Sequence, residues 1–497
     1  MNILTAHIAI PALTALMIMF VRTQKQARAI AAIGMALQLA LSFLLLYLFL
    51  QERANGNQAA ILFAQSFPWY PALGISFDVG VDGIAVAMIL LTSIVIFTGI
   101  MASWEVSKLY KEFFVSLIVL ATGVYGFFVS LDLFLLFLFF ELAVIPMYLL
   151  IGIWGSGPKE YAAMKLTLML MGGSALLIVG ILGVYFSSYA EGARSFNIIM
   201  LGQQHVPIAL QRVFFPMLFI GFGVIGALFP FHTWSPDGHS SAPTAVSMLH
   251  AGVLMKLGGY GCLKVAIFLL PEAASEMAWV FIILTSVSVI YGALATVVQT
   301  DLKYINAYSS VSHCGLVLFG ILMLNKTAST GAVLQMVSHG LMTALFFALI
   351  GMLYARTNTR TITQMGGLMK VLPFLSVCYV IAGLTSLGLP GLSGFVAEMT
   401  IFVGAFEHDG AFYRVATFIV VSSIVVTAVY ILRVIGILLM GPVREEAYHG
   451  FPKAKWFEKV ATISLIVGIL VIGLAPLWLS DMIRDSLGAI VDKLASR

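Results

Sequence analysis

Runs of about 20 consecutive apolar residues recur along nearly the whole chain and constrain its fold more than any other feature. A bilayer core of about 30 Å is crossed by a helix of that length, whereas the strands of an outer-membrane barrel alternate over about ten residues. The run Leu166–Phe186 carries no charge and does not alternate, so we expect helices. About fourteen spans are expected. They cover approximately residues 3–21, 29–49, 83–103, 113–130, 132–153, 164–187, 212–231, 243–269, 277–298, 304–324, 330–354, 372–405, 413–439 and 458–480.

The composition agrees with a protein surrounded by lipid. Hydrophobic residues make up 61% of the 497 residues and charged residues only 10%, against about 25% charged in soluble proteins. This excludes a soluble enzyme, a disordered chain, a nucleic-acid binder and a disulfide scaffold. Cys262, Cys314 and Cys378 lie far apart in apolar segments, which is typical of buried small side chains rather than of metal ligands. The expected fold class is therefore an all-α polytopic membrane protein.

The loop charges predict the orientation of the chain, because Lys and Arg concentrate in cytoplasmic loops. Basic residues follow spans one, eleven and thirteen, whereas the loops of the opposite side carry acids such as Asp78, Glu272 and Glu407. The basic loops share one side only if the span count is right, so the two inferences support each other. We expect a bacterial inner (plasma) membrane protein with both termini on the outer side. The basic residues are Arg22, Lys25, Arg28, Arg356, Arg360, Lys370, Arg433, Arg444, Lys453, Lys455 and Lys459.

Two spans are interrupted, span seven near Pro230 and span twelve near Pro390 and Gly391. Such residues free backbone groups, which is tolerated only where protein or water satisfies them. Broken helices in corresponding positions of two units are typical of inverted repeats in secondary transporters. Because the breaks are five spans apart, we assign spans 4–8 and 9–13 to two inverted five-helix repeats. The expected division is N-terminal spans 1–3 (1–112), first repeat (113–269), second repeat (270–440) and C-terminal span (441–497).

Ionisable side chains within the spans are the candidate functional residues, since each costs at least about 2.5–3.5 kcal/mol at the bilayer centre. Carboxylates, lysines and histidines at one depth can pass on a proton through intervening waters. The alternative is that each group merely pairs with another helix; we favour this alternative for one lone histidine, and transport for Glu141, Lys256 and Glu398 together. The expected proton relay is Glu141, Lys256, His313, His339 and Glu398, and further candidates are Lys165, His250 and His232.

Motifs for other chemistry are missing from the sequence. His232 and His239 flank Trp234 without clear metal spacing, so we expect no metal site. There is no CxxCH haem motif, no cysteine cluster, no Gly-rich phosphate loop after a strand and no nucleophile elbow. We therefore expect no cofactor in this chain, and any uphill transport must draw its energy from a partner subunit.

Four stretches carry distinctive patterns: FPFHTWSPDGHSSAPT at 229–244, LMKLGGYG at 254–261, DLKYINAYSSVSHCG at 301–315 and LPGLSGFVAE at 389–398. They resemble, in one register over about residues 80–440, the antiporter-like subunits of NADH:quinone oxidoreductase (respiratory complex I). The length is more similar to the M-type subunits than to the L-type, which add a long C-terminal helix. The resemblance implies a proton-translocating membrane-arm subunit beside other antiporter-like subunits, with NADH, flavin, iron–sulfur clusters and quinone bound by partner subunits.

The same resemblance implies roles for individual residues. By position, Glu141 matches the family's glutamate of span five, Lys256 its lysine of span eight and Glu398 its terminal residue of span twelve. His313 and His339 match its central histidines.

The sequence departs from the family pattern around span seven. A lysine usually precedes the Pro-Phe-His of that span, and the stretch around Ile225 has no ionisable group; Tyr304 also replaces a usual arginine. An isolated buried glutamate needs a nearby base to exchange its proton, so we expect His250 to replace the lysine and to face Glu141. The alternative is that His250 donates to a backbone carbonyl.

Three functions remain open from the sequence. The favoured one is a subunit of NADH:quinone oxidoreductase that translocates protons, coupled to electron transfer in other subunits. The second is the related subunit of a multi-subunit cation/proton antiporter or membrane-bound hydrogenase. The third is a structural subunit whose proton path is closed by the missing lysine.

Overall fold

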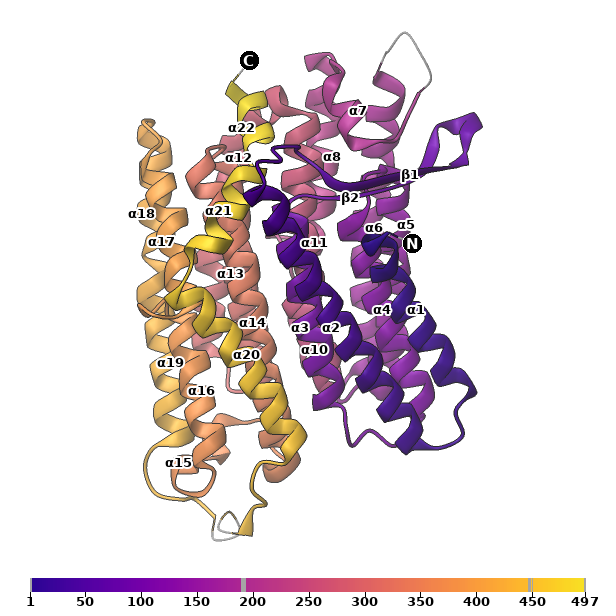
Figure 1. The fold of residues 1–497 in the computed structure, drawn as a ribbon. Coiled ribbons are helices and arrows are strands. Elements are labelled where there is room, and N and C mark those ends of the chain that lie inside the picture. The colour runs from indigo at the N-terminus through magenta and orange to yellow at the C-terminus, as the bar shows by residue number, and fades with distance from the viewer. Residues whose placement is uncertain (1, 189–193, 446–447, 449, 496–497) are drawn as a thin grey trace.

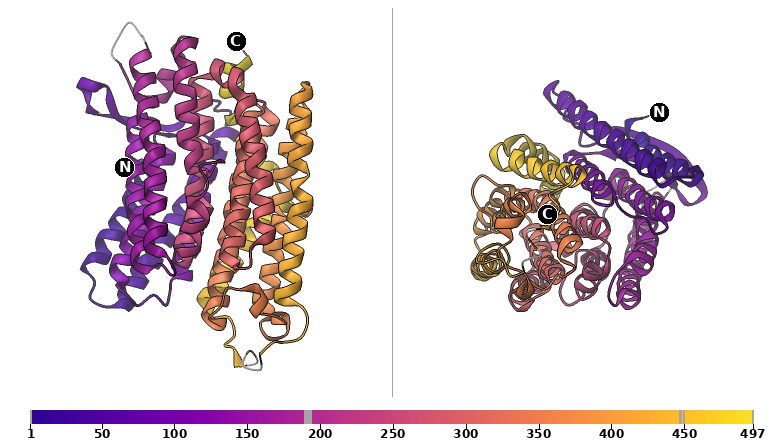
Figure 2. Two further views of the ribbon diagram at one scale, coloured as in Figure 1. Left: turned by 180° about the vertical axis from the view of Figure 1, so that it is seen from behind. Right: turned by 90° about the horizontal axis from the view of Figure 1, so that it is seen from below.

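The computed structural model describes every residue except 1, 189–193, 446–447, 449 and 496–497. Long helices stand side by side in one bundle (Figure 1; Figure 2). Within the described residues, twelve helices are long and apolar enough to cross a membrane. The prediction of a mostly helical, membrane-spanning chain is therefore confirmed.

The elements begin and end as follows. The first half of the chain contains α1 (Ile3–Phe20), α2 (Gln24–Ala54), β1 (Leu62–Tyr70), η1 (Pro71–Leu73), β2 (Ile75–Val81), α3 (Gly83–Ala102), α4 (Tyr110–Val129), α5 (Leu133–Trp154), α6 (Lys159–Ser187), α7 (Ile198–Gln203), α8 (Ile208–Ile225) and α9 (Trp234–Ser241). The second half contains α10 (Thr244–Leu249), η2 (His250–Leu254), α11 (Met255–Gly261), η3 (Cys262–Ile267), α12 (Pro271–Val298), α13 (Leu302–Leu322), α14 (Lys326–Thr357), η4 (Ile362–Gln364), α15 (Leu368–Val371), α16 (Pro373–Ser386), α17 (Ser393–Phe406), α18 (Ala411–Val421), α19 (Ser423–Leu439), α20 (Trp456–Leu474), α21 (Leu477–Ser486) and α22 (Gly488–Ala495).

Aspartates fix the starts of two central helices. The Asp132 carboxylate accepts hydrogen bonds from the backbone amides of Phe134 (2.8 Å) and Leu135 (3.0 Å) at the start of α5. The Asp301 carboxylate accepts one from the amide of Lys303 (2.8 Å) at the start of α13. The first amides of a helix have no partner within the helix, so these caps satisfy groups that would otherwise remain unpaired.

A two-stranded antiparallel sheet interrupts the helical pattern, and the prediction of an all-α chain was wrong here. Strands β1 and β2 pair with Phe67 opposite Phe77, at the upper end of the bundle in Figure 1. The turn between them needs Gly74, because its φ is +67° and a side chain would meet the backbone oxygen of Arg194. The sheet lies in the connection between two apolar runs. Long apolar runs predict membrane-spanning helices, and they give no signal for strands in such a connection.

Two helices are interrupted near the prolines and glycines noted in the sequence. Helix α8 ends at Ile225 and α9 begins at Trp234, and α16 and α17 are separated by residues 387–392. The freed backbone groups have partners: the Trp234 indole donates to the Val224 carbonyl (3.0 Å), and the Phe229 amide donates to the Ser288 hydroxyl (2.6 Å). Protein groups thus replace the missing helical hydrogen bonds, as they must in a membrane.

Other segments differ from the single helices that were expected. The segment expected as one helix over 243–269 contains two π-helical stretches, η2 and η3, on either side of α11. The span expected over 413–439 is confirmed, because α18 and α19 form one apolar run, Ala411–Leu439, with a single turn residue at Ser422. Two short amphipathic helices, α21 and α22, follow the last apolar run; they are too short and too polar to stand out as spans.

The basic loops gather at one end of the bundle. The α1–α2 turn, the segment after α14 and the connection from α19 to α20 all lie at the bottom of Figure 1, whereas the described C-terminal helix α22 lies at the top. The basic loops identified in the sequence therefore also lie together in the folded molecule, at one end of the bundle.

Candidate functional site

Two of the expected relay residues are in direct contact in the centre of the bundle. The Lys256 ammonium, on α11, lies 2.6 Å from Nδ1 of His339 on α14 and also donates to the Ala251 carbonyl. Nε2 of His339 lies 3.2 Å from the Ser310 hydroxyl. Lys256 and His339 are each 1% exposed, so no solvent separates them. The π-helical turn η2 directly precedes α11, and such turns are frequent at functional sites.

Two further residues extend this contact toward α17. The ring of His313, on α13, lies 5.2 Å from the ring of His339. Nδ1 of His313 lies 3.1 Å from the Gln335 amide and 3.6 Å from the Glu398 carboxylate, and its Nε2 lies 3.1 Å from the Ser386 hydroxyl. The structure thus brings four of the five expected relay residues together. We call Lys256, His339, His313 and Glu398 the ionisable line.

The break between α16 and α17 makes room for the last member of the line. Gly388 has a φ of +70°, and a Cβ there would lie 2.7 Å from Oε2 of Glu398. A residue other than glycine would therefore strain the backbone and displace the carboxylate at once.

Replacing Gly388 with alanine tests this geometry. We expect a loss of roughly 1–2 kcal/mol from the left-handed backbone conformation and, in addition, a defect in proton translocation because Glu398 moves. Gly157 is the matched control, since its φ is +65° but no atom lies within 4 Å of the added Cβ. Gly157→Ala should lower only the thermal midpoint. Equal activity of the two variants would contradict a positioned Glu398.

Glu141 lies apart from the ionisable line. Its helix, α5, exposes Leu138 (42%) and Ile145 (62%) on either side of it, and Glu141 itself is half-buried. The polar side chain beside its carboxylate is Ser174 of α6, and Oε1 of Glu141 has no hydrogen-bond partner among the described residues. Glu141 therefore faces the side of the bundle.

His250 packs against rings rather than against Glu141. Its ring stacks on the indole of Trp234, with centroids 5.0 Å apart and an angle of 22°, and lies 4.4 Å from the ring of His239. In the described part of the chain, no hydrogen bond or ion pair joins His250 to Glu141. A small apolar cavity lined by Val144, Ile225 and His250 lies on the side of His250 that faces α5. His250 thus makes no direct contact with Glu141, and its expected orientation toward Glu141 stays a prediction.

The remaining candidates lie near the first helix break. Lys165 forms an ion pair with Asp237 (2.7 Å), whose other oxygen accepts a hydrogen bond from the Tyr304 hydroxyl (3.1 Å). His232 is buried between the rings of Phe229 and Tyr291. Tyr304, where the family resemblance would place an arginine, therefore still has an acidic partner.

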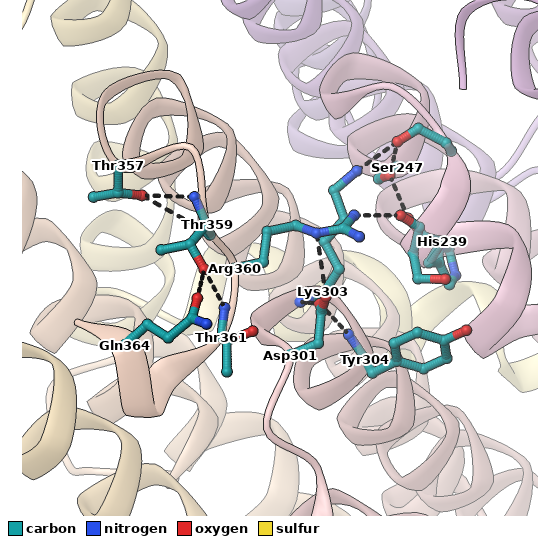
Figure 3. A network of polar contacts seen from close by, with 12 residues as sticks. His239, Ser247, Asp301, Lys303, Tyr304, Thr357, Thr359, Arg360, Thr361 and Gln364 are labelled. Carbon is teal, nitrogen blue, oxygen red and sulfur yellow. Dashed lines mark hydrogen bonds and ion pairs between the residues drawn. The ribbon is translucent and has the colours of Figure 1, made fainter. Parts of the chain in front are cut away.

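A second polar network connects the basic end of the bundle with the surroundings of His239 (Figure 3). Arg360 pairs with Asp301 (3.1 Å), and the buried ammonium of Lys303 donates to the Ala242 carbonyl (2.6 Å). The Ser247 hydroxyl donates to the His239 carbonyl (3.0 Å). Lys303 and Gln335 were not among the residues expected to be functional; the signal for Lys303 was its place two residues after the Asp301 cap.

Metal-binding geometry is not found in the described residues, because no group of three or more His, Cys, Asp or Glu side chains converges there. Cys262, Cys314 and Cys378 are free and buried, in agreement with their expected packing role.

Helices long and apolar enough to span a membrane, two interrupted helices and a buried line of ionisable side chains together define a polytopic membrane protein with a polar interior. The chain belongs to the family described as NADH:quinone oxidoreductase/Mrp antiporter, TM, which matches residues 130–427. The resemblance noted in the sequence is thereby confirmed.

Known proteins of this family are similar over most of their length. The chain is 38% identical over 444 residues to "NAD(P)H-quinone oxidoreductase chain 4-2" of Synechocystis sp., covering 88% of this chain and 78% of the relative. It is 35% identical over 425 residues to "NADH-quinone oxidoreductase subunit M" of Rickettsia conorii, covering 85% and 84%. A chain of respiratory complex I from Thermus thermophilus with bound NADH shares the fold, with a TM-score of 0.89, 23% identity and 99% of each chain covered.

Proposed function

We propose that this chain is the M-type membrane-arm subunit of an NADH:quinone oxidoreductase and translocates protons, while other subunits carry out electron transfer. The observation that carries the proposal is the ionisable line, in which four buried groups follow one another at 2.6 Å, 5.2 Å and 3.6 Å. The names of the relatives favour this function over a cation/proton antiporter. The family description covers both, but both relatives quoted above are quinone oxidoreductase subunits.

The chemistry of the line is proton exchange between neighbouring side chains. A charged Lys256 can give a proton to Nδ1 of His339, whose other nitrogen then releases one toward Ser310 and His313. His313 in turn exchanges a proton with Glu398. Lysine, histidine and carboxylate each have a protonated and a deprotonated form. The ionisable line can therefore take up a proton at one end and release a proton at the other.

The repeat architecture belongs to the same proposal. Fourteen spans result if α10–η3 and the pair α16–α17 are added to the twelve long apolar helices. Inverted repeats over spans 4–8 and 9–13 are supported by matching caps. Asp132 forms a bridge with Asn197 and Asp301 forms one with Thr361, and the two caps belong to opposite ends of the bundle. The division at residues 112, 269 and 440, and both termini on the outer side, follow from this assignment.

The partners and cofactors belong to the same proposal. Helices α5 and α6 form an apolar side of the bundle that exposes Leu138, Ile145 and Leu168. We propose that a neighbouring antiporter-like subunit covers this side. This chain is then the non-redox, proton-translocating part of the enzyme, and NADH, flavin, iron–sulfur clusters and quinone are bound by other subunits.

Glu398→Gln in the assembled, reconstituted complex tests the proposed function. An amide cannot take up and release the proton, so we expect the rate of proton translocation to fall by about tenfold or more. Glu407→Gln is the control, because Glu407 ends the same helix, is exposed, and only accepts a hydrogen bond from Thr327 (3.0 Å). Normal pumping by Glu398→Gln at normal assembly would refute the role of the ionisable line.

A further inference from the structure

Helix α19 carries one polar stripe in an otherwise apolar segment. Ser423, Thr427 and Tyr430 follow one another at i, i+4 and i+7, so they share one face of the helix. All three are buried, and the Tyr430 hydroxyl lies 2.9 Å from the Ser309 hydroxyl of α13. The stripe therefore faces the centre of the bundle, where the ionisable line ends, and the function proposed above assigns it no role.

The start of α19 places two adjacent serines, Ser422 and Ser423, in different surroundings. The exposed Ser422 side chain donates to the Ile419 carbonyl (2.6 Å) of its own chain, whereas the next residue, Ser423, is only 6% exposed. Two adjacent serines thus have opposite environments. This provides a buried hydroxyl and a matched exposed one within a single turn.

A cavity of about 10 Å³ lies between the stripe and the end of the ionisable line. This is about the volume that one water molecule needs, and a buried water also needs two to four polar partners. The cavity has more polar side chains around it than one water needs. Its polar lining consists of Ser312, His313, Ser386, Glu398, Ser423 and Thr427.

The weakest contact of the ionisable line borders this cavity. The 3.6 Å between Nδ1 of His313 and Oε1 of Glu398 is too long for a hydrogen bond. Among the described residues, no side chain or backbone group donates a hydrogen bond to the Glu398 carboxylate, although Glu398 is only 8% exposed. A buried carboxylate without a donor is costly, and a polar contact at this distance is commonly completed by water.

We propose that one water molecule, held in this cavity by the hydroxyls of Ser423 and Thr427, connects His313 with Glu398, and that these two residues are positioning residues of the proton relay. This inference rests on the proposed function. In the step, a charged His313, which has a proton on each ring nitrogen, gives one of them to the water oxygen. The water gives one of its own protons to the Glu398 carboxylate. Neutral histidine, a protonated carboxyl and an unchanged water result, and the reverse step restores the starting state.

The double variant Ser423→Ala/Thr427→Val tests the proposal in the assembled complex. Loss of two hydrogen bonds to the water should slow proton translocation about tenfold, while assembly stays normal. Ser422→Ala is the control and should pump normally. Infrared difference spectra supply a second readout, since the O–H band of the bound water should shift in H₂¹⁸O and should be missing from the double variant but present in Ser422→Ala.

A cavity-filling variant tests the same proposed water site without removing a hydroxyl group. Val289 lines the cavity, and Val289→Ile adds one methylene where the water would lie. We expect the water band to disappear and pumping to slow as in the double variant. If Glu398→Gln stops pumping but the double variant pumps normally and keeps its water band, the positioning role of α19 is refuted and the proposed function stands. If Glu398→Gln itself pumps normally, the relay fails and this step fails with it.

Discussion

Lys256→Met should nearly abolish proton translocation by the assembled complex. Methionine has a similar length but carries no proton, so His339 loses the only ionisable side chain that bonds directly to it in the described chain. We expect a fall of about a hundredfold, as for the loss of a general acid. Stability should fall by about 1–3 kcal/mol, because methionine leaves Nδ1 of His339 and the Ala251 carbonyl without the Lys256 donor.

Lys256→Arg separates charge from proton exchange at the same position. Arginine keeps the positive charge but does not give up its proton in proteins, so this variant should also fail to pump. The measurements are proton uptake into proteoliposomes and the thermal midpoint of the purified complex. Pumping by the arginine variant would mean that Lys256 acts only through its charge, and the line would then not be a relay.

The membrane explains why most of the fold could be predicted from the sequence. A helix in lipid must form all its backbone hydrogen bonds and show an apolar surface to the lipid. Its length and its breaks can therefore be predicted from the sequence. The breaks near Pro230 and Pro390 were predicted for this reason. The sheet of β1 and β2 was missed because it lies in a connection between apolar runs.

The part of the site that could be predicted consists of ionisable residues, because burying an ionisable side chain within a membrane span is costly. Lys256, His313, His339 and Glu398 stand out because ionisable groups within spans need an explanation. Ser310, Gln335 and Ser386, which bond to the two histidines, gave no such signal, since neutral polar residues are tolerated at many places in helices.

The position of Glu141 could not be predicted, because the sequence does not tell which helices are neighbours. Helix α5 packs mainly against α4 and α6, and this leaves Glu141 on the side of the bundle. The ring of His250, which was expected to face Glu141, packs against Trp234 and His239. Rotation about one helix axis was not enough to predict which ring would be adjacent.

Arg356→Met should cost about 3–5 kcal/mol of stability, because it leaves a buried carboxylate unpaired. The Arg356 guanidinium at the end of α14 bonds to both oxygens of Glu458 on α20, at 2.9 Å and 2.7 Å, and the two residues are 9% and 7% exposed. The pair joins the C-terminal span to the rest of the bundle. We expect a lower thermal midpoint of the complex and less subunit in the membrane.

Two further variants show whether burial is the cause. Arg356→Met/Glu458→Gln removes both charges and should recover much of the loss, since the unpaired carboxylate is gone. Arg414→Met breaks an ion pair with Asp409 at 3.4 Å whose side chains are 53% and 102% exposed, and it should cost less than about 1 kcal/mol. Equal thermal midpoints for Arg356→Met and Arg414→Met would show that the pair at the base of α20 contributes no more than an exposed one.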